Sequence, residues 1–274
     1  MSDSNFNSVQ VGDVMFGDPA RPALIAGPCV IESRDHTLRL AEQVRAVCGR
    51  LRLPGVFKSS FDKANRQSAD SFRGPGMDEG LAILAEVRRD LGMPVLSDIH
   101  EPSQAAPAGE VLDVVQVPAF LCRQTDVLLA AGRTGRCVNL KKGQFVSPEQ
   151  MGSAVEKVRR TGNDRVLLTE RGTFFGYGRL VNDMTAIDVM RRFAPVVFDA
   201  THSCQRPGGG GTHSGGEPAF APVLARAAIA AGADALFVEV HDDPANAKSD
   251  AATVWPIDRL EALLAECRRI RETL

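Results

Sequence analysis

An alternation of short apolar runs with longer stretches of helical periodicity constrains this chain more than any other feature. The apolar runs occupy residues 23–27, 55–58, 94–98, 111–117, 137–141, 165–170, 195–199 and 235–239. The helical stretches between and after them include residues 36–51, 78–91, 148–160, 220–231 and 257–274. Strands that alternate with helices form a parallel sheet with the helices outside, and eight such units are the number that closes a barrel. We therefore predict an α/β fold, a (β/α)8 TIM barrel.

The length of the chain fits one such barrel. We predict a single domain over residues 1–274, because this is near the usual size of a one-domain α/β barrel. We expect residues 1–6 to be disordered, and residues 7–17 to form a short N-terminal β-hairpin that plugs one end of the barrel. A doubly wound open sheet is the alternative, but no Gly-x-Gly-x-x-Gly turn follows the first strand, which disfavours a dinucleotide-binding version.

The charge balance argues against several classes of partner. The chain has 32 basic and 34 acidic residues, so we expect neither a nucleic-acid-binding nor a membrane-surface protein. The polar start, Met1–Asn5, lacks the pattern of an export signal, and no apolar run is long enough to span a bilayer. We therefore expect a cytoplasmic protein. Its six scattered cysteines form no Cys-x-x-Cys pair, and we interpret them as reduced thiols.

Every predicted strand ends in polar or ionisable groups. In chain order these include Cys29, the loop 58–66, Asp98 with His100, Gln116, Lys141 with Gln144, Glu170 with Arg171, Asp199 with His202, and Glu239 with His241. In a (β/α)8 barrel the strand ends and the loops that follow them meet at one mouth. Any one of these residues could be an ordinary surface side chain. Eight together favour a convergent polar site.

Two kinds of chemistry are present at these strand ends. Lys63, Lys141 and Arg171 come from separate strands, and gathering like charges is unfavourable unless an anion compensates, so they indicate a phosphorylated or carboxylated substrate. The second kind is a possible metal site, because Cys29, His202, Glu239 and Asp250 offer a thiolate, an imidazole and two carboxylates. This mixture suits Zn²⁺, Fe²⁺, Co²⁺ or Mn²⁺ better than Mg²⁺ or Ca²⁺. From the residues alone, a cysteine on an apolar strand is more often part of the core than a ligand. His100 and His241 are interpreted as supporting or substrate-facing residues.

A glycine-rich segment, residues 206–216, follows the seventh strand. Its place on the active face of a barrel favours a mobile lid, and a slack surface loop is the alternative.

Many of these motifs together resemble a known family. The residues that carry the resemblance are Ile25–Ser33, Lys63–Arg66, Arg73–Gly76, Leu96–His100, Gln116–Arg123, Asn139–Phe145, Thr169–Gly172 and Asp199–Ser203. The chain resembles the 3-deoxy-D-manno-octulosonate 8-phosphate synthases from about residue 22 to its C-terminus. That family implies a (β/α)8 barrel, usually a homotetramer, which condenses phosphoenolpyruvate with arabinose 5-phosphate, releases phosphate and supplies lipopolysaccharide synthesis.

The resemblance also implies roles for individual residues. Those that would hold phosphoenolpyruvate are Lys63, Lys141 and Arg171, helped by Gln116 and Ser60, with Lys58 facing the same site. Asn65 and Arg66 would reach arabinose 5-phosphate, and Arg123 would contact the sugar phosphate from a neighbouring subunit. Cys29, with His202, Glu239 and Asp250, would place the chain in the metal-dependent group of the family. Lys63, Asp98 and His202 are the candidate catalytic residues.

Several alternatives stay open at this point. Family members commonly have Ser after Lys-Ala-Asn-Arg, whereas this chain has Gln67, which puts one phosphate contact in doubt. The related 3-deoxy-arabino-heptulosonate 7-phosphate synthases use erythrose 4-phosphate and typically carry a Pro where this chain has Asn65. An Asn can hydrogen-bond a sugar hydroxyl, so we favour the five-carbon acceptor. A Schiff-base aldolase using Lys141, and a sugar-phosphate-binding protein without turnover, are the remaining alternatives.

Overall fold

The computed structural model describes residues 8–66, 68, 70–208 and 215–274, and within them it confirms the predicted barrel. Eight parallel strands close into a ring in the order β11-β8-β7-β6-β5-β4-β3-β14, and β11 pairs with β14 to complete it. The strands are β3 (Ala23–Gly27), β4 (Gly55–Lys58), β5 (Val95–Asp98), β6 (Val114–Val117), β7 (Cys137–Lys141), β8 (Val166–Glu170), β11 (Val196–Asp199) and β14 (Ala235–His241).

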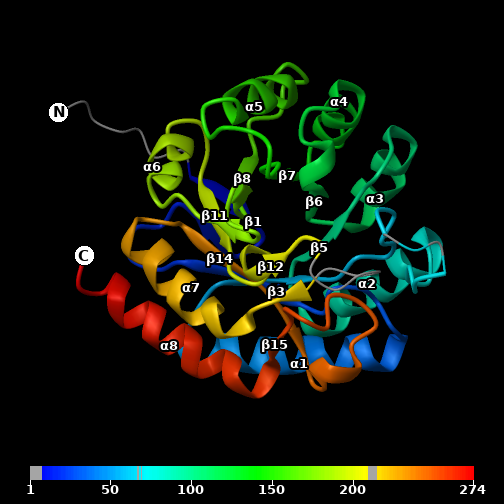
Figure 1. Cartoon of the computed structure of the whole chain (residues 1–274). Coiled ribbons are helices and arrows are strands. Elements are labelled where there is room, and N and C mark those ends of the chain that lie inside the picture. Colours follow the sequence, from blue (N-terminus) through cyan, green and yellow to red (C-terminus); the bar gives the residue numbers. More distant parts are fainter. Residues whose placement is uncertain (1–7, 67, 69, 209–214) are drawn as a thin grey trace.

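Eight α-helices surround the strands in the described part of the chain (Figure 1). They are α1 (Arg34–Leu51), α2 (Met77–Leu91), α3 (Ala105–Val111), α4 (Thr125–Arg133), α5 (Met151–Arg159), α6 (Thr185–Arg191), α7 (Ala221–Ala230) and α8 (Leu260–Arg271). Single 3₁₀ turns, η1 to η6, occupy Pro102–Gln104, Ala119–Leu121, His202–Cys204, Pro218–Phe220, Pro244–Asn246 and Ile257–Arg259. Two predicted ranges were too long: the run at 111–117 contains the end of α3, and the stretch at 257–274 begins with η6 and ends at Arg271.

The local sequence explains why the strands and helices take these places. All positions of β3, β7 and β8 are buried, because helices cover the outside of a barrel and side chains fill its inside. Helix α1 begins at an N-cap, where the Ser33 hydroxyl accepts the His36 N–H. Its buried apolar residues recur with helical spacing and pack into the layer between helices and strands. No helix among the described residues is both long and apolar enough to cross a membrane.

The predicted N-terminal hairpin is confirmed. Strands β1 (Val9–Val11) and β2 (Val14–Phe16) pair antiparallel, and Gly12 at their turn has a φ of +55°, which suits glycine. Their apolar side chains join the inner core of the barrel, which has these members: Val9, Val11, Val14, Phe16, Ala23, Ile25, Val56, Leu96, Val114, Cys137, Leu167, Val197, Ala235 and Phe237. The hairpin therefore covers the end of the barrel from which the strands start, and leaves the other end for chemistry.

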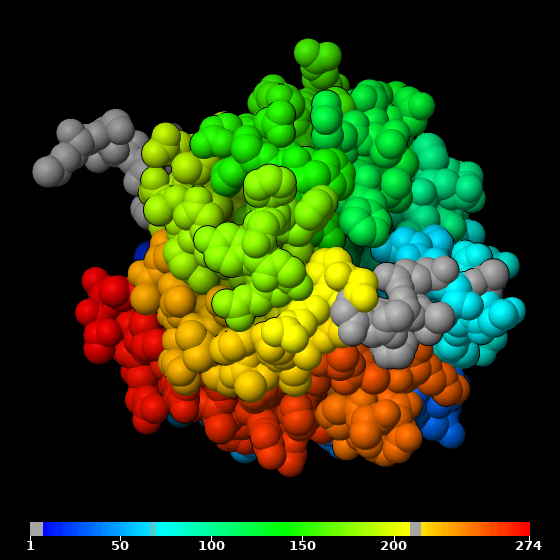
Figure 2. Space-filling model, in the orientation of Figure 1, coloured from blue at the N-terminus to red at the C-terminus, as the bar shows by residue number. Residues whose placement is uncertain are grey.

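Short strands in the loops add to that other end. β9 (Thr173–Phe174) pairs with β10 (Leu180–Val181), β12 (Gln205–Arg206) with β13 (Gly215–Gly216), and β15 (Trp255–Pro256) extends β14. In Figure 2 the yellow-green region around residues 170–182 forms a ridge over the middle of this face, beside the yellow segment near residue 205. The central part of the predicted lid, residues 209–214, lies outside the described residues, as do Gln67 and the predicted disordered segment 1–6.

Candidate functional site

A cavity of about 770 Å³ lies where the barrel strands end. Polar and ionisable residues from all over the chain line it: Lys63, Asn65, Arg66, Asp98, His100, Gln116, Lys141, Gln144, Arg171, His202, Gln205, Glu239, Ser249 and Asp250 are among them. The convergence expected from the strand ends is therefore present. The cavity is large enough for two small phosphorylated molecules, because drug-sized ligand sites are typically of about 300–1,000 Å³.

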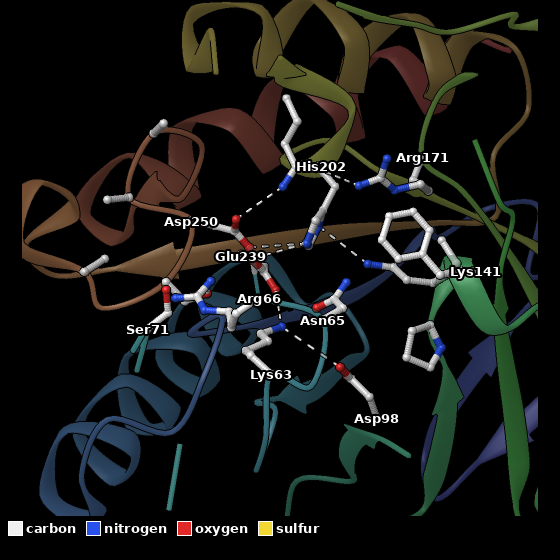
Figure 3. Close-up of a pocket in the computed structure, with 18 of the residues that line it drawn as sticks. Lys63, Asn65, Arg66, Ser71, Asp98, Lys141, Arg171, His202, Glu239 and Asp250 are labelled. Carbon is white, nitrogen blue, oxygen red and sulfur yellow. Dashed lines mark hydrogen bonds and ion pairs between the residues drawn. The ribbon is translucent and has the colours of Figure 1, made fainter. Parts of the chain in front are cut away.

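Cations line one side of the cavity (Figure 3). Lys141 Nζ lies 2.6 Å from Asp199 Oδ2, and Lys63 Nζ lies 3.9 Å from Glu239 Oε1 and 4.0 Å from Asp98 Oδ2. Burial acts to lower the pKa of Lys63, but the carboxylates around it, Asp98 and Glu239 among them, outweigh burial and raise it. Lys63 is therefore a fixed positive charge at neutral pH.

Arg171 differs from the two lysines because part of its guanidinium is unpaired. Its Nη2 donates to Gln205 Oε1 at 2.7 Å, whereas its Nη1 is buried and has no hydrogen-bond partner in the described part of the chain. Burial lowers the pKa of Arg171, and the carboxylates of Asp199 and Asp250 act in the opposite direction. A buried guanidinium with an unpaired donor is an unfavourable arrangement, and an anionic ligand in the cavity would relieve it.

A buried hydrogen-bond chain crosses four neighbouring strands beneath the cavity and reaches Ser60, which follows a fifth. Thr169 donates to Asn139 at 2.7 Å, Asn139 to Gln116 at 2.8 Å, and Gln116 to Asp98 at 2.9 Å. Ser60 donates to the other oxygen of Asp98 at 3.0 Å. Burial acts to raise the pKa of Asp98, but the positive charges led by Lys63 outweigh burial and lower it. Asp98 is therefore an oriented anion beside Lys63.

The four predicted metal ligands lie next to these cations. Ligand atoms of Cys29, Glu239 and Asp250 all lie within 4.8 Å of one another, and Cys29 Sγ is 3.1 Å from Asp250 Oδ2. His202 Nε2 lies 3.6 Å from Glu239 Oε2 and 3.8 Å from Asp250 Oδ2. Burial, followed by the charges of Asp250 and Glu239, raises the pKa of the Cys29 thiol well above its usual value.

This donor set fits a divalent cation. His202 Nδ1 lies 2.8 Å from Asp199 Oδ2, so its proton faces Asp199 and its Nε2 lone pair faces Glu239 and Asp250. The sulfur and the two carboxylates lie within 4.8 Å of one another, and the His202 lone pair faces the two carboxylates, so a cation would stabilise this group. The carboxylate of Asp199 behind a histidine is also the usual support of a metal-ligating imidazole. Nitrogen, sulfur and oxygen donors together suit a metal of the zinc type.

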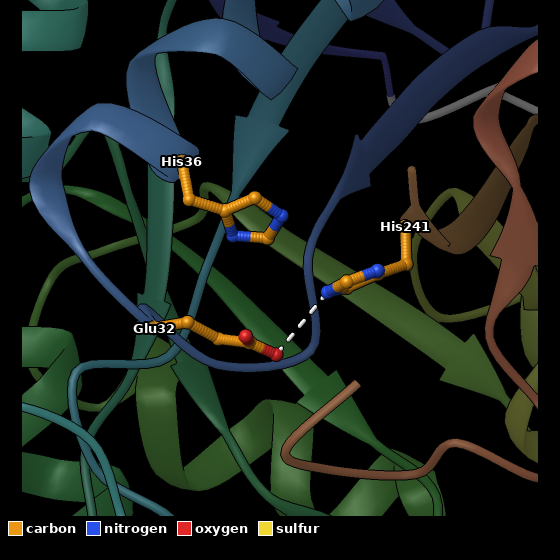
Figure 4. A group of neighbouring side chains, drawn as sticks. All are labelled: Glu32, His36 and His241. Carbon is orange, nitrogen blue, oxygen red and sulfur yellow. Dashed lines mark hydrogen bonds and ion pairs between the residues drawn. The ribbon is translucent and has the colours of Figure 1, made fainter. Parts of the chain in front are cut away.

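A second group with ligand spacing lies outside the cavity. Glu32, His36 and His241 offer atoms within 4.8 Å of one another (Figure 4). At His241, however, protons already occupy the contacts of both ring nitrogens. His241 Nδ1 accepts the N–H of Asp243 at 2.9 Å, so Nε2 carries the ring proton and donates it to Glu32 at 3.2 Å. His36 Nε2 pairs with Asp242 at 2.9 Å. This group therefore joins the start of α1 to the loop after β14.

Three residues predicted to bind substrate, Lys58, Ser60 and Arg123, do not line the cavity. Lys58 is fully buried behind the cavity, where its Nζ donates to Glu239 Oε1 at 2.6 Å and to the carbonyls of Pro28 and Cys29. Ser60 is also fully buried and reaches the site only through Asp98. Arg123 is exposed and is not among the lining residues, so within one chain it does not reach the cavity. Their predicted roles as substrate ligands stay predictions.

Sequence reasoning gave no role to three residues that matter in the structure. Asp199 pairs with both Lys141 and His202, Gln205 holds Arg171, and the buried Ser249 contacts Cys29. The position of Asp199 at the end of a strand was the available signal. Ser249 lies in a loop and Gln205 in the two-residue strand β12, and neither has a periodicity that marks a side chain as pointing inward. All six cysteines are free and buried in the structure.

Comparisons with known proteins agree with this geometry. The family model described as "DAHP synthetase I family" matches residues 3–273. The chain is 56% identical over 268 residues to a protein of Koribacter versatilis, covering 97% of this chain and 96% of that one. It is 56% identical over 265 residues to a protein of Syntrophotalea carbinolica, covering 96% of each, and 57% identical over 255 residues to one of Syntrophobacter fumaroxidans, covering 91% and 88%. Each of the three is named 2-dehydro-3-deoxyphosphooctonate aldolase.

Proposed function

The chain belongs to the DAHP synthetase I family, and from this premise we propose that it condenses phosphoenolpyruvate with D-arabinose 5-phosphate and water. The products would be 3-deoxy-D-manno-octulosonate 8-phosphate, a precursor of lipopolysaccharide, and inorganic phosphate. One observation carries the proposal: buried cations and a set of metal-type ligands lie next to each other at a single cavity. The names of the relatives support arabinose 5-phosphate over erythrose 4-phosphate as the acceptor.

The cationic side is the proposed phosphoenolpyruvate site. Lys63, Lys141 and Arg171 would hold its carboxylate and phosphate, and the unpaired Nη1 of Arg171 supports this because it needs an acceptor. Gln116 lines the same space and would assist. Lys58 would act from behind by holding Glu239, which is the contact its ammonium makes. Positioned charges of this kind raise the rate by orienting the substrate and by offsetting charge that develops during reaction.

The acceptor would lie next to the loop that carries Asn65 and Arg66, which both line the cavity. We propose that Arg123 of a neighbouring copy completes the site in a homotetramer, since within one chain Arg123 stays outside it. Exposed aromatic residues on this face support a covered surface, because large exposed apolar side chains mark interaction sites. They are Phe120, Phe145, Phe174, Phe175, Tyr177 and Phe220.

Cys29, His202, Glu239 and Asp250 would hold one divalent ion, Zn²⁺, Fe²⁺, Co²⁺ or Mn²⁺. When bound, such an ion can polarise the sugar aldehyde, orient the sugar or increase the acidity of the attacking water. The side chains around it have their own tasks. Asp199 keeps the proton of His202 on Nδ1, and Lys58 holds Glu239 in place.

The reaction balances as follows. A bond forms between C3 of phosphoenolpyruvate and the aldehyde carbon, and the aldehyde oxygen takes up one proton to become a hydroxyl. Water adds at C2 and gives up one proton. Cleavage of the C2–O bond then leaves a carbonyl at C2, and the remaining hydroxyl proton goes to the released phosphate. Lys63 and the anionic Asp98 lie beside one another, where the Lys63 ammonium could stabilise charge on the reacting oxygen and Asp98 could orient the water. His202 is the candidate to move a proton at the metal side.

The test is phosphate release from phosphoenolpyruvate in the presence of arabinose 5-phosphate, with and without a strong chelator. We expect release that stops on chelation and returns with an added divalent ion. Phosphate release that is unchanged by the chelator would support the synthase activity and show that the metal is not essential. Release only with erythrose 4-phosphate would establish the other acceptor. Trapping by borohydride would establish a Schiff base at Lys141, against the synthase mechanism.

A further inference from the structure

One buried hydroxyl connects the two halves of the cavity. Ser249 is 3% exposed, and its Oγ lies 2.9 Å from Arg66 Nη1 and 3.0 Å from Cys29 Sγ. Arg66 belongs to the proposed acceptor side and Cys29 to the proposed metal set. In the described part of the chain, Ser249 is the residue whose side chain touches both.

The chemistry of the three groups fixes the direction of the hydrogen bonds. A guanidinium has donors only, so Ser249 Oγ accepts from Arg66. The hydroxyl hydrogen is then left to point elsewhere, and a thiolate at Cys29 can only accept it. Because a metal requires the thiolate, the metal-bound state would contain a chain that runs from the guanidinium through the hydroxyl to the sulfur. Hydrogen bonds in such a chain polarise and strengthen one another.

Arg66 also holds the segment that carries Ser249. Its Nη2 donates to the Lys248 carbonyl at 2.8 Å, and its Nε donates to the Phe72 carbonyl at 3.2 Å. These contacts use three of the five N–H groups of the guanidinium, and two remain for a ligand. An anionic group that takes the remaining two would keep Arg66, and with it Ser249, in the observed place.

We propose that Ser249 is a positioning residue that donates a hydrogen bond to the metal-bound sulfur of Cys29, and that Arg66 couples this bond to the anionic end of the acceptor. The inference rests on the proposed function and adds to it a linkage between two ligands. Coupling between two binding sites is reciprocal, so the sugar phosphate would tighten metal binding by the same factor as the metal tightens binding of the sugar phosphate.

The test uses the metal-free chain, titrated with Co²⁺ and followed by the sulfur-to-cobalt charge-transfer absorption, with no turnover. We expect Ser249→Ala to bind Co²⁺ about 10–100-fold more weakly, as is typical for loss of a partner of a metal ligand. The absorption should move to longer wavelength, because a hydrogen bond lowers the energy of the sulfur electrons. Arabinose 5-phosphate should tighten Co²⁺ binding by about fivefold or more in the parent chain and leave Ser249→Ala unchanged.

Asn246→Ala is the matched control. Asn246 lies on the same loop, is exposed, and its side chain donates to Asp243 at 2.7 Å, away from Cys29 and Arg66. This variant should titrate like the parent. Thermal unfolding of the metal-free variants should be alike, which separates positioning from loss of fold. A second arm uses Arg66→Ala, which should weaken Co²⁺ binding in the parent but not in the Ser249→Ala background, because both changes break one chain.

The outcomes separate the inference from the function on which it rests. Suppose that the parent chain binds both ligands and releases phosphate, and that Ser249→Ala has the same Co²⁺ affinity and absorption. This result would overturn the inference and leave the proposed function standing. Additive effects of Arg66→Ala and Ser249→Ala would overturn the coupling through the hydroxyl. A parent chain that binds neither Co²⁺ nor arabinose 5-phosphate would overturn the proposed function, and the inference with it.

Discussion

Two groups of side chains with the spacing of metal ligands include residues of the last barrel strand. Glu239 of β14 belongs to the group with Cys29 and Asp250, and His241 of the same strand belongs to the group with Glu32 and His36. Residue type and distance do not separate them. The groups differ in the position of their protons.

His202 and His241 show the difference most clearly. The ring proton of His202 faces Asp199, which leaves its other nitrogen turned toward two carboxylates. The ring proton of His241 faces Glu32 instead, because the N–H of Asp243 occupies the other nitrogen. A metal could bind Nε2 of His202 without displacing a proton. Binding to Nε2 of His241 would instead require the ring to lose its proton and become an imidazolate. Hydrogen bonds to the far side of a histidine therefore distinguish a candidate ligand from a structural contact.

The largest effect should follow from breaking the first group. Cys29→Ala removes the only sulfur donor among the four proposed ligands, and we expect loss of the bound metal and a fall in phosphate release of about 100-fold or more. Metal content by elemental analysis and phosphate release are the measurements. Survival of both would show that the metal assignment is wrong, and that Cys29 is an ordinary core residue.

How much of this could be read from the sequence differs between the fold and the site. The barrel was predictable because β-then-α alternation and fully apolar strands are local patterns, and the ranges for β3, β4 and β7 agree with the structure. The strand at 111–117 was overextended because Val111 and Leu112 are apolar in α3 and its C-cap, which a short run cannot distinguish from a strand. Convergence at the mouth followed from the topology, since parallel strand ends meet there.

The finer arrangement of the site was beyond sequence reasoning. Lys58 ends β4 and Lys63 lies five residues later, and both ammonium groups approach Glu239 Oε1, yet Lys58 is fully buried while Lys63 lines the cavity. Asp250 has a φ of +50°, a conformation that Asp tolerates better than most residues, and this turns its carboxylate toward Cys29. The proton positions of His202 and His241 depend on Asp199 and Asp243, and such partners emerge only once the chain is folded.

A second prediction tests the proton position of His202. Asp199→Asn offers an amide in place of the carboxylate, so the preference for a proton on Nδ1 is lost. We expect metal affinity to fall by about 10–100-fold, the usual effect of altering the partner of a ligating histidine. Titration of the metal-free variant with Co²⁺ measures it. Because Asp199 also pairs with Lys141, an increase in KM for phosphoenolpyruvate should accompany the change. An unchanged Co²⁺ affinity would show that the proton position of His202 does not determine metal binding, and would contradict the contrast with His241.

A third prediction addresses the second group directly. Glu32 accepts hydrogen bonds from His241 and from the Lys248 N–H at 2.8 Å, so Glu32→Gln should lower the free energy of unfolding by about 1–2 kcal/mol. The metal content per chain should not change, because this group holds its protons without a cation. Urea unfolding and elemental analysis are the measurements. A loss of one bound metal ion per chain would show that Glu32, and not only Glu239, ligates an ion.

The smallest expected effect concerns Asp242. Its pH dependence separates the contribution of the carboxylate charge to stability from the contribution of packing. Burial acts to raise its pKa, but hydrogen bonds from Arg39 and His36 outweigh burial and lower the pKa from 3.8 to about 2. Folding therefore favours the carboxylate, and the stability this adds is fully present above pH 3.8 and is lost as the pH falls through about 2.

Asp242→Asn should be less stable than the parent at pH 5, by about 1 kcal/mol or less, because the site is partly exposed and screened. The gap should narrow between pH 4 and pH 3 as the parent carboxylate begins to protonate in the unfolded chain, as measured by urea unfolding of both proteins. A gap that stays constant over this range would assign the contribution of Asp242 to packing, and proton placement would then not explain why the second group needs no metal.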